Sequence, residues 1–154
     1  MEPHVLLALW DPPLKVEGEM ALELVCGEEA ISLGLRFSNV PCFVPWDILK
    51  SPKLDVLEHS EALRAVARSG RVGFSWLGTP CRSMTLARKP ELRSWDLPMG
   101  RCNLSAAQAD LVSIGNALAF FTVEFCMELL MARAYFAVEN PHRSFLWMLP
   151  CILT

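Results

Sequence analysis

Short apolar runs recur along the chain, and each ends at turn-forming residues. Runs of this length and composition predict buried β-strands. They occupy residues 4–10, 20–26, 71–78 and 134–140. A further stretch, residues 40–48, is expected to be extended because its prolines limit any helix.

Segments with helical spacing of apolar positions separate these strands. Residues 28–37 and 55–69 each fit one helix, and Gly70 is placed to cap the second one. Ser105 and Gln108 form a capping-box pattern, which opens a long helix. Apolar residues continue that helix at Leu111, Ile114, Leu118, Phe121, Phe125 and Leu129.

The alternation of strands and helices predicts an α/β fold with a mostly parallel sheet that is flanked by helices. A chain of 154 residues suits a single domain, residues 1–154. Ligands of such sheets bind at the carboxyl ends of the strands. Gly27, Cys81 and Glu139 are all predicted to lie at such ends.

A long polar and basic segment, residues 79–103, follows the third predicted strand. Loops of this length inside a compact domain are usually functional or disordered. The segment opens with Thr79, Pro80 and Cys81, and five basic residues follow: Arg82, Arg88, Lys89, Arg93 and Arg101. Nearby positive charge favours the nucleophilic thiolate of a cysteine and suits an anionic substrate.

Composition and charge exclude several classes of protein. The net charge is −3, so a strongly basic nucleic-acid binder is not indicated, and any such contact has to be local. The six cysteines form no CxxC pair and no Cys/His cluster with metal spacing. We expect reduced thiols, an intracellular protein and no metal site. The N-terminal residues lack the basic region of a signal peptide.

Three motifs, in their chain order, resemble those of the DNA cytosine-5 methyltransferases. "LELVCGEEAISLGL" places an acidic residue and a glycine around a strand-to-helix turn, "LGTPC" ends a later strand, and "VENP" ends the last one. The resemblance covers residues 22–147. It implies a Rossmann-like methyltransferase fold, S-adenosylmethionine as cofactor, DNA as partner and, in a eukaryote, a nuclear location.

The resemblance also implies roles for the residues of the second and third motifs. Cys81 matches the nucleophile that attacks carbon 6 of a flipped cytosine. Pro80 would shape the turn that presents this cysteine. Glu139 would hold or protonate ring nitrogen 3, and Asn140 would support its loop.

Cofactor and DNA contacts follow from the same resemblance. Gly27 matches part of the cofactor loop, Glu23 lies in the strand before it, and Asp47 is a candidate contact to adenosine or its ribose. The basic residues Arg82, Arg88, Lys89 and Arg93 are expected to contact DNA phosphates.

The chain departs from the family pattern at two places. Glu28 and Glu29 follow Gly27, where the family has a second glycine that lets the backbone approach the ligand. The family also continues with an Arg-containing motif and a target-recognition region, which the sequence after "FLWMLPC" does not contain. We therefore expect an exposed sheet edge that a partner chain could cover.

Two other functions stay open beside catalysis. The chain could be a non-catalytic remnant or binding module that keeps the sheet without turnover. It could also be a membrane-associated helical protein that uses residues 117–138. Glu124, Glu128 and Arg133 lie in that segment and are costly in a bilayer, so we expect a buried helix plus a strand instead.

Overall fold

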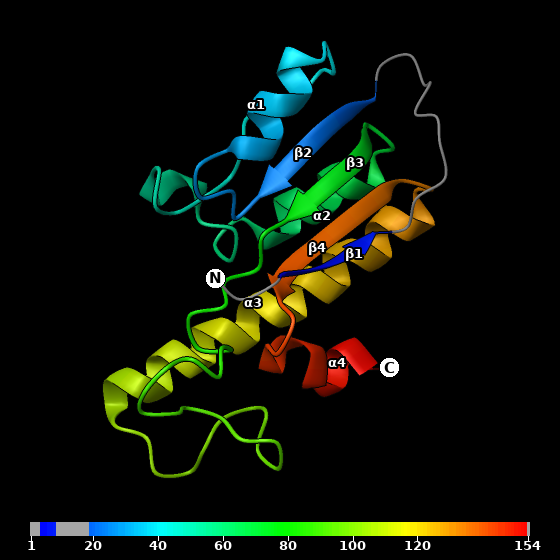
Figure 1. Cartoon of the computed structure of the whole chain (residues 1–154). Coiled ribbons are helices and arrows are strands. Elements are labelled where there is room, and N and C mark those ends of the chain that lie inside the picture. Colours follow the sequence, from blue (N-terminus) through cyan, green and yellow to red (C-terminus); the bar gives the residue numbers. More distant parts are fainter. Residues whose placement is uncertain (1–3, 9–18, 154) are drawn as a thin grey trace.

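The structure, a computed structural model, describes residues 4–8 and 19–153. Among these residues, the strands form one sheet in the order β1-β4-β3-β2 (Figure 1). The strands are β1 (His4–Ala8), β2 (Met20–Leu24), β3 (Val72–Leu77) and β4 (Tyr135–Pro141). The last three run parallel, whereas β1 pairs antiparallel with β4. The predicted α/β class is therefore confirmed.

The stretch that was expected to be extended continues the sheet beyond β2. Cys42 and Trp46 form isolated parallel bridges to Ala21 and Leu24. The stretch contains Pro41 and Pro45, which have no backbone N–H to give to a ladder, so pairing is restricted to a few positions. As a result β2 has a backbone neighbour on both sides, which places its carboxyl end inside the sheet.

The helices lie close to their predicted positions. They are α1 (Ala30–Phe37), α2 (Ser60–Arg68), α3 (Ala106–Met131) and α4 (Pro150–Leu153), with short 3₁₀ helices at Pro52–Leu54 and Phe145–Met148. The capping box of Ser105 and Gln108 is present in both directions at the start of α3. The second helix begins later than predicted, because the Asp55 carboxylate accepts hydrogen bonds from Leu57 and Glu58 and holds a turn there.

The two faces of the sheet are covered by different helices. Leu22 and Leu24 of β2 point into the main core together with Leu63 of α2 and Phe125 of α3. Because side chains alternate along a strand, Glu23 points to the opposite face, where it meets α1. The structure thus places α2 and α3 on one face and α1 on the other (Figure 1).

Ion pairs join α2 to α3. Arg64 lies 3.1 Å from Glu124 and 3.2 Å from Glu128, and Arg68 lies 2.8 Å from Glu128. The Glu128 side chain is only 13 % exposed, so its pairing with two guanidinium groups is less screened than the other pairs. This network accounts for the glutamates that argued against a membrane span in this segment.

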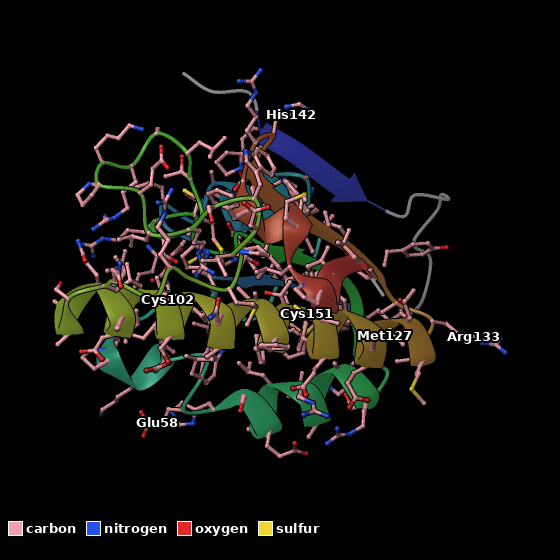
Figure 2. All side chains as sticks on the ribbon, turned by 90° about the horizontal axis from the view of Figure 1, so that it is seen from below. Glu58, Cys102, Met127, Arg133, His142 and Cys151 are labelled. Atoms are coloured by element: carbon pink, nitrogen blue, oxygen red, sulfur yellow. The ribbon has the colours of Figure 1, made fainter. Side chains whose placement is uncertain are left out.

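Helix α3 is long and apolar enough to cross a membrane by length and composition alone. In the structure it connects the parallel strands β3 and β4, and Ala119, Phe125 and Leu129 on its inner face are fully buried. Its outer face exposes Phe120 and Met127, the second of which projects from the helix in Figure 2. The segment is a helix followed by a strand, as expected, but only one face of the helix is buried.

Candidate functional site

The order of the strands creates a crevice at one edge of the sheet. From β2 the chain passes through α1 to the extended stretch on the outer side, and from β3 it passes through α3 to β4. The connections of β2 and β3 therefore leave in opposite directions, and the carboxyl ends of these strands flank a topological switch point. Ligands of open α/β sheets bind at such points.

The loop after β2 has an unusual backbone. Val25, Gly27 and Glu29 all have positive φ, at 54°, 50° and 56°. This conformation is strained for a β-branched residue such as Val25. Residues with strained backbones are found most often at functional sites. The loop is held by a hydrogen bond of 2.6 Å from the Val25 N–H to the carbonyl of Trp46.

Asp47 fixes the same loop from the neighbouring stretch. It is 2 % exposed, and its two carboxylate oxygens accept hydrogen bonds of 2.8 Å from the backbone N–H groups of Gly27 and Leu49. Burial, and then the charges of Asp47 and Glu23, raise the pKa of the neighbouring Cys26 thiol to about 11, so it is protonated at neutral pH. Two predicted cofactor residues, Gly27 and Asp47, are thus in direct contact.

Glu23 lies deeper than a ligand contact requires. It is 3 % exposed, and its carboxylate accepts a hydrogen bond of 2.7 Å from the backbone N–H of Ser32 in the first turns of α1. The side chain therefore holds α1 against β2. A direct contact of Glu23 with a cofactor stays a prediction.

The exit of β3 passes very close to the strained loop. The Gly78 N–H donates a hydrogen bond of 3.1 Å to the carbonyl of Leu24. A Cβ atom at position 78 would lie 2.7 Å from the carbonyl oxygen of Val25. Glycine is required here because two backbones meet at the switch point.

The second and third motifs meet directly. The side-chain amide of Asn140, at the end of β4, donates a hydrogen bond to the carbonyl of Thr79, just before Pro80 and Cys81. Asn140 is 1 % exposed, and its Oδ1 atom is buried without a partner. Cys81 and Glu139 are both half-buried, and Glu139 lies on the opposite face of β4 from Asn140.

A cavity of about 170 Å³ opens beside these motifs. It is lined by Val25, Asp47, Ile48, Asp55, Val56, Leu57, Pro80, Ile114 and Leu118. Two of the predicted residues, Asp47 and Pro80, therefore border one cavity. Asp55 was not predicted as a site residue, because it stands between two elements with no motif around it.

The prediction that Arg93 contacts DNA is wrong. Arg93 is fully buried, and its five N–H groups donate hydrogen bonds to neutral oxygens. The acceptors are the Ser83 carbonyl and hydroxyl, the Pro98 and Val112 carbonyls and Asn116 Oδ1. Burial lowers the pKa of the Arg93 guanidinium to about 10, which still leaves a cation at neutral pH. Arg93 therefore holds the loop onto α3 and does not reach a phosphate.

The remaining basic residues of the loop differ in their exposure and in whether they form ion pairs. Arg82 is exposed and Arg88 is half-buried. Lys89 and Arg101 lie 2.7 Å and 2.8 Å from the carboxylate oxygens of Glu91. Hydrogen bonding and charge from Lys89, and then from Arg101, lower the pKa of Glu91, so this carboxylate offsets part of the basic charge.

Two exposed basic residues after β4 were missed by the sequence analysis. His142 and Arg143 follow Pro141 directly, and His142 projects from the end of β4 in Figure 2. Their place next to the "VENP" motif could have drawn attention to them, because the carboxyl end of β4 borders the same edge of the sheet. Arg143 adds positive charge beside residues 79–103.

The described part of the chain contains no group of three or more His, Cys, Asp or Glu side chains that could hold a metal ion. Comparison of the chain with protein-family models, with curated proteins and with solved structures gives no match.

Proposed function

We propose that this chain is a DNA cytosine-5 methyltransferase-like domain of Rossmann-like topology. The observation that carries the proposal is the hydrogen bond from Asn140 to the Thr79 carbonyl, which joins the "GTPC" and "ENP" motifs at the carboxyl edge of the sheet. A nucleophile and a base contact must approach one substrate ring together, and this bond couples the segments that carry them. Elements supplied by a partner chain could complete the recognition of DNA.

The reaction assigns a step to each of two side chains. The Cys81 thiolate gives an electron pair to carbon 6 of a flipped cytosine, which forms a sulfur–carbon bond and shifts electron density onto carbon 5. Glu139, as the acid, hydrogen-bonds ring nitrogen 3 and stabilises the charge displaced there. S-adenosylmethionine supplies the methyl group that carbon 5 accepts. Loss of the carbon 5 proton to a base then expels the Cys81 thiolate and restores the ring.

The cavity beside Pro80 suits the nucleoside part of this cofactor. Its apolar walls suit an adenine ring, and Asp47 and Asp55 offer carboxylate oxygens to ribose hydroxyls. Gly27 is less suited to the methionine part, because its N–H already donates to Asp47. Glu28 is exposed beside it and could pair with the amino group of the methionine part.

A covalent trap tests the assignment of Cys81. The chain is incubated with S-adenosylmethionine and DNA that contains 5-fluorocytosine, whose fluorine cannot leave as a proton does, and the adduct is measured by mass. We expect an adduct with the wild type and with Cys102→Ser, which changes an exposed cysteine farther along the same loop. Cys81→Ser should form none. An adduct that persists in Cys81→Ser, or no adduct with a folded wild-type chain, would contradict the mechanism.

Calorimetric titration with S-adenosylmethionine tests the cofactor separately. Gly27→Asp should abolish saturable binding, because it adds a side chain at a positive φ and a carboxylate beside Asp47. The matched control is Gly34→Asp, which makes the same change at an exposed site in α1 where a Cβ meets no atom within 4 Å. Equal binding by both variants would remove Gly27 from the cofactor site.

A specific observation favours a second function, a non-catalytic nucleic-acid-binding module. The Gly27 N–H is occupied by Asp47, and the cavity of about 170 Å³ is smaller than the roughly 300–1,000 Å³ of typical ligand sites. A folded chain that binds DNA but neither binds S-adenosylmethionine nor forms an adduct would identify this second function.

A further inference from the structure

The loop between β3 and α3 contains a compact turn that displays a tryptophan. Ser94 and Leu97 exchange two backbone hydrogen bonds of 3.3 Å and 3.1 Å, so Trp95 and Asp96 stand at the tip of a tight turn. The Arg101 N–H donates a hydrogen bond of 2.9 Å to the Leu92 carbonyl and closes the base of this turn. Trp95 is 57 % exposed, which is a large indole surface to leave open to water.

The position of the turn is fixed from inside. Arg93, next to Ser94, is fully buried, and all its donors are used. Asn116 of α3 accepts from Arg93 and donates a hydrogen bond of 2.9 Å to the Met99 carbonyl on the other side of the tip. A side chain displayed on such a support loses little conformational entropy when it binds.

Contacts connect Trp95 to the turn that carries Cys81. The Trp95 ring packs on Phe145 with 5.4 Å between ring centroids and 60° between ring planes. The Phe145 N–H donates a hydrogen bond of 2.8 Å to the carbonyl of Met84, and the Met84 N–H donates one of 2.8 Å to the carbonyl of Cys81. The indole is therefore anchored on one side, and three successive contacts connect it to the turn that carries Cys81.

Two exposed arginines lie on the segments that these contacts connect to Trp95. Arg82 follows Cys81, and Arg143 lies two residues before Phe145; both are exposed. Within the described residues neither arginine forms an ion pair, in contrast to Lys89 and Arg101. An aromatic ring beside unpaired arginines suits a strand of nucleic acid, because the bases stack on the ring while the cations meet the phosphates.

We propose that Trp95 is a stacking platform for an unpaired base of a DNA strand that lies along this edge, with Arg82 and Arg143 on its phosphates. The inference rests on the proposed function in one respect, because it names single-stranded DNA as the form of the substrate. It adds a recognition residue that none of the three motifs contains. The same platform would serve the catalytic domain and the non-catalytic binding module.

Fluorescence anisotropy of a labelled oligonucleotide tests the platform. At fixed salt, Trp95→Ala should weaken binding of a single strand of about 12 nucleotides by about tenfold, and Trp95→Phe should weaken it less, because a stacking ring remains. The matched control is Phe37→Ala. Phe37 is 92 % exposed at the last position of α1, so it lies toward the amino ends of the strands, and its loss should leave affinity unchanged.

Inorganic polyphosphate as a competitor separates stacking from charge. Trp95→Ala should bind polyphosphate with the affinity of the wild type. Arg143→Ala should lose affinity for both polymers, and the salt dependence of its DNA binding should have a slope that is smaller by about one. The platform is overturned if the wild-type chain does not bind the single strand, if Trp95→Ala binds like the wild type, or if Phe37→Ala loses as much. A docking site for a protein would give the second of these results.

The cofactor titration keeps the two proposals apart. Trp95→Ala should bind S-adenosylmethionine as the wild type does, because Trp95 does not line the cavity beside Pro80. Trp95-dependent DNA binding without cofactor binding would support the platform and reject the methyltransferase. Cofactor binding and a Cys81 adduct, together with no effect of Trp95→Ala on DNA binding, would support the methyltransferase and reject the platform.

Discussion

The buried amide of Asn140 donates a hydrogen bond to the backbone carbonyl of Thr79, so the end of β4 is tied to the first residues after β3. The two residues belong to motifs that are 61 positions apart in the chain. Asn140 Oδ1 has no partner, so the amide nitrogen alone makes the contact. The geometry therefore depends on a donor at this position.

Asn140→Asp should be strongly destabilising at neutral pH. The substitution replaces the donor by a carboxylate that faces a carbonyl in the interior, and an unpaired buried charge costs about 3 kcal/mol or more. Burial raises the pKa of such a carboxyl group above its unfolded value, so the loss appears as the pH rises above about 4 and shrinks at lower pH. Urea unfolding at several pH values measures it. Asn103→Asp, at an exposed site, should change stability by less than about 0.5 kcal/mol.

Arg93→Lys should release the loop from α3. Lysine keeps the charge but has three donors instead of five, so at least two buried acceptors lose their partner, at about 1–3 kcal/mol each. Hydrogen exchange should speed up in residues 83–101 and stay unchanged in β2 and β3. Arg82→Lys, at an exposed site in the same loop, is the control. Unchanged protection of the loop in Arg93→Lys would show that other contacts hold it.

Two glycine-to-alanine substitutions should change the stability of the fold in opposite directions. At Gly34 in α1 a Cβ meets no atom within 4 Å, so alanine should stabilise by about 0.5–1 kcal/mol through helix propensity. At Gly115 in α3 a Cβ would lie 2.3 Å from the Ser83 hydroxyl and 3.1 Å from Arg93 Nη2. Alanine there should destabilise by about 1–3 kcal/mol, as overpacking does. Thermal unfolding of both variants gives the answer, and stabilisation by Gly115→Ala would contradict the packing of Arg93.

Alkaline pH should weaken the fold through Cys126. Burial raises the pKa of this thiol in α3 from 9.0 to about 12, so the folded state keeps a proton that the unfolded chain releases above pH 9. Stability contributed by the neutral thiol is complete below pH 9 and is lost as the pH rises toward 12.

Between pH 8 and pH 10 the wild type should lose about 1.4 kcal/mol more unfolding free energy than Cys126→Ala does. Cys102→Ala should follow the wild type, because Cys102 is exposed. Urea titrations at both pH values measure the difference between the chains, from which every effect that they share cancels. Parallel losses in all three chains would mean that Cys126 ionises freely in the folded state.

Local patterns in the sequence predicted most of the elements. The capping box at Ser105, the positive φ of Gly70 and the extended stretch with Cys42 and Trp46 are all present. These features depend on residues that are close in sequence, so periodicity and capping chemistry describe them well. The antiparallel pairing of β1 with β4 was not predicted, because it joins distant segments and no local signal sets its direction.

The candidate site was predicted only in its outline. The meeting of the second and third motifs follows from parallel strands whose carboxyl ends share one edge, and Asn140 and Thr79 do meet there. The interior place of Arg93 could not be predicted, because arginines in polar loops are usually exposed and Gly115, which makes room for it, lies on another element. Trp95 gave no signal either, since its exposure depends on the folding of the whole loop.

The packing of Arg93 against a glycine of α3 also constrains how descendants of this sequence can vary. The guanidinium donates to Asn116 and to the Ser83 hydroxyl, and a Cβ at position 115 would lie 2.3 Å from that hydroxyl, so positions 83, 93, 115 and 116 should vary together. In a lineage that loses both Arg93 and the Ser83 hydroxyl, position 115 becomes free to gain the alanine that helices favour. We therefore expect coupled substitutions at these positions.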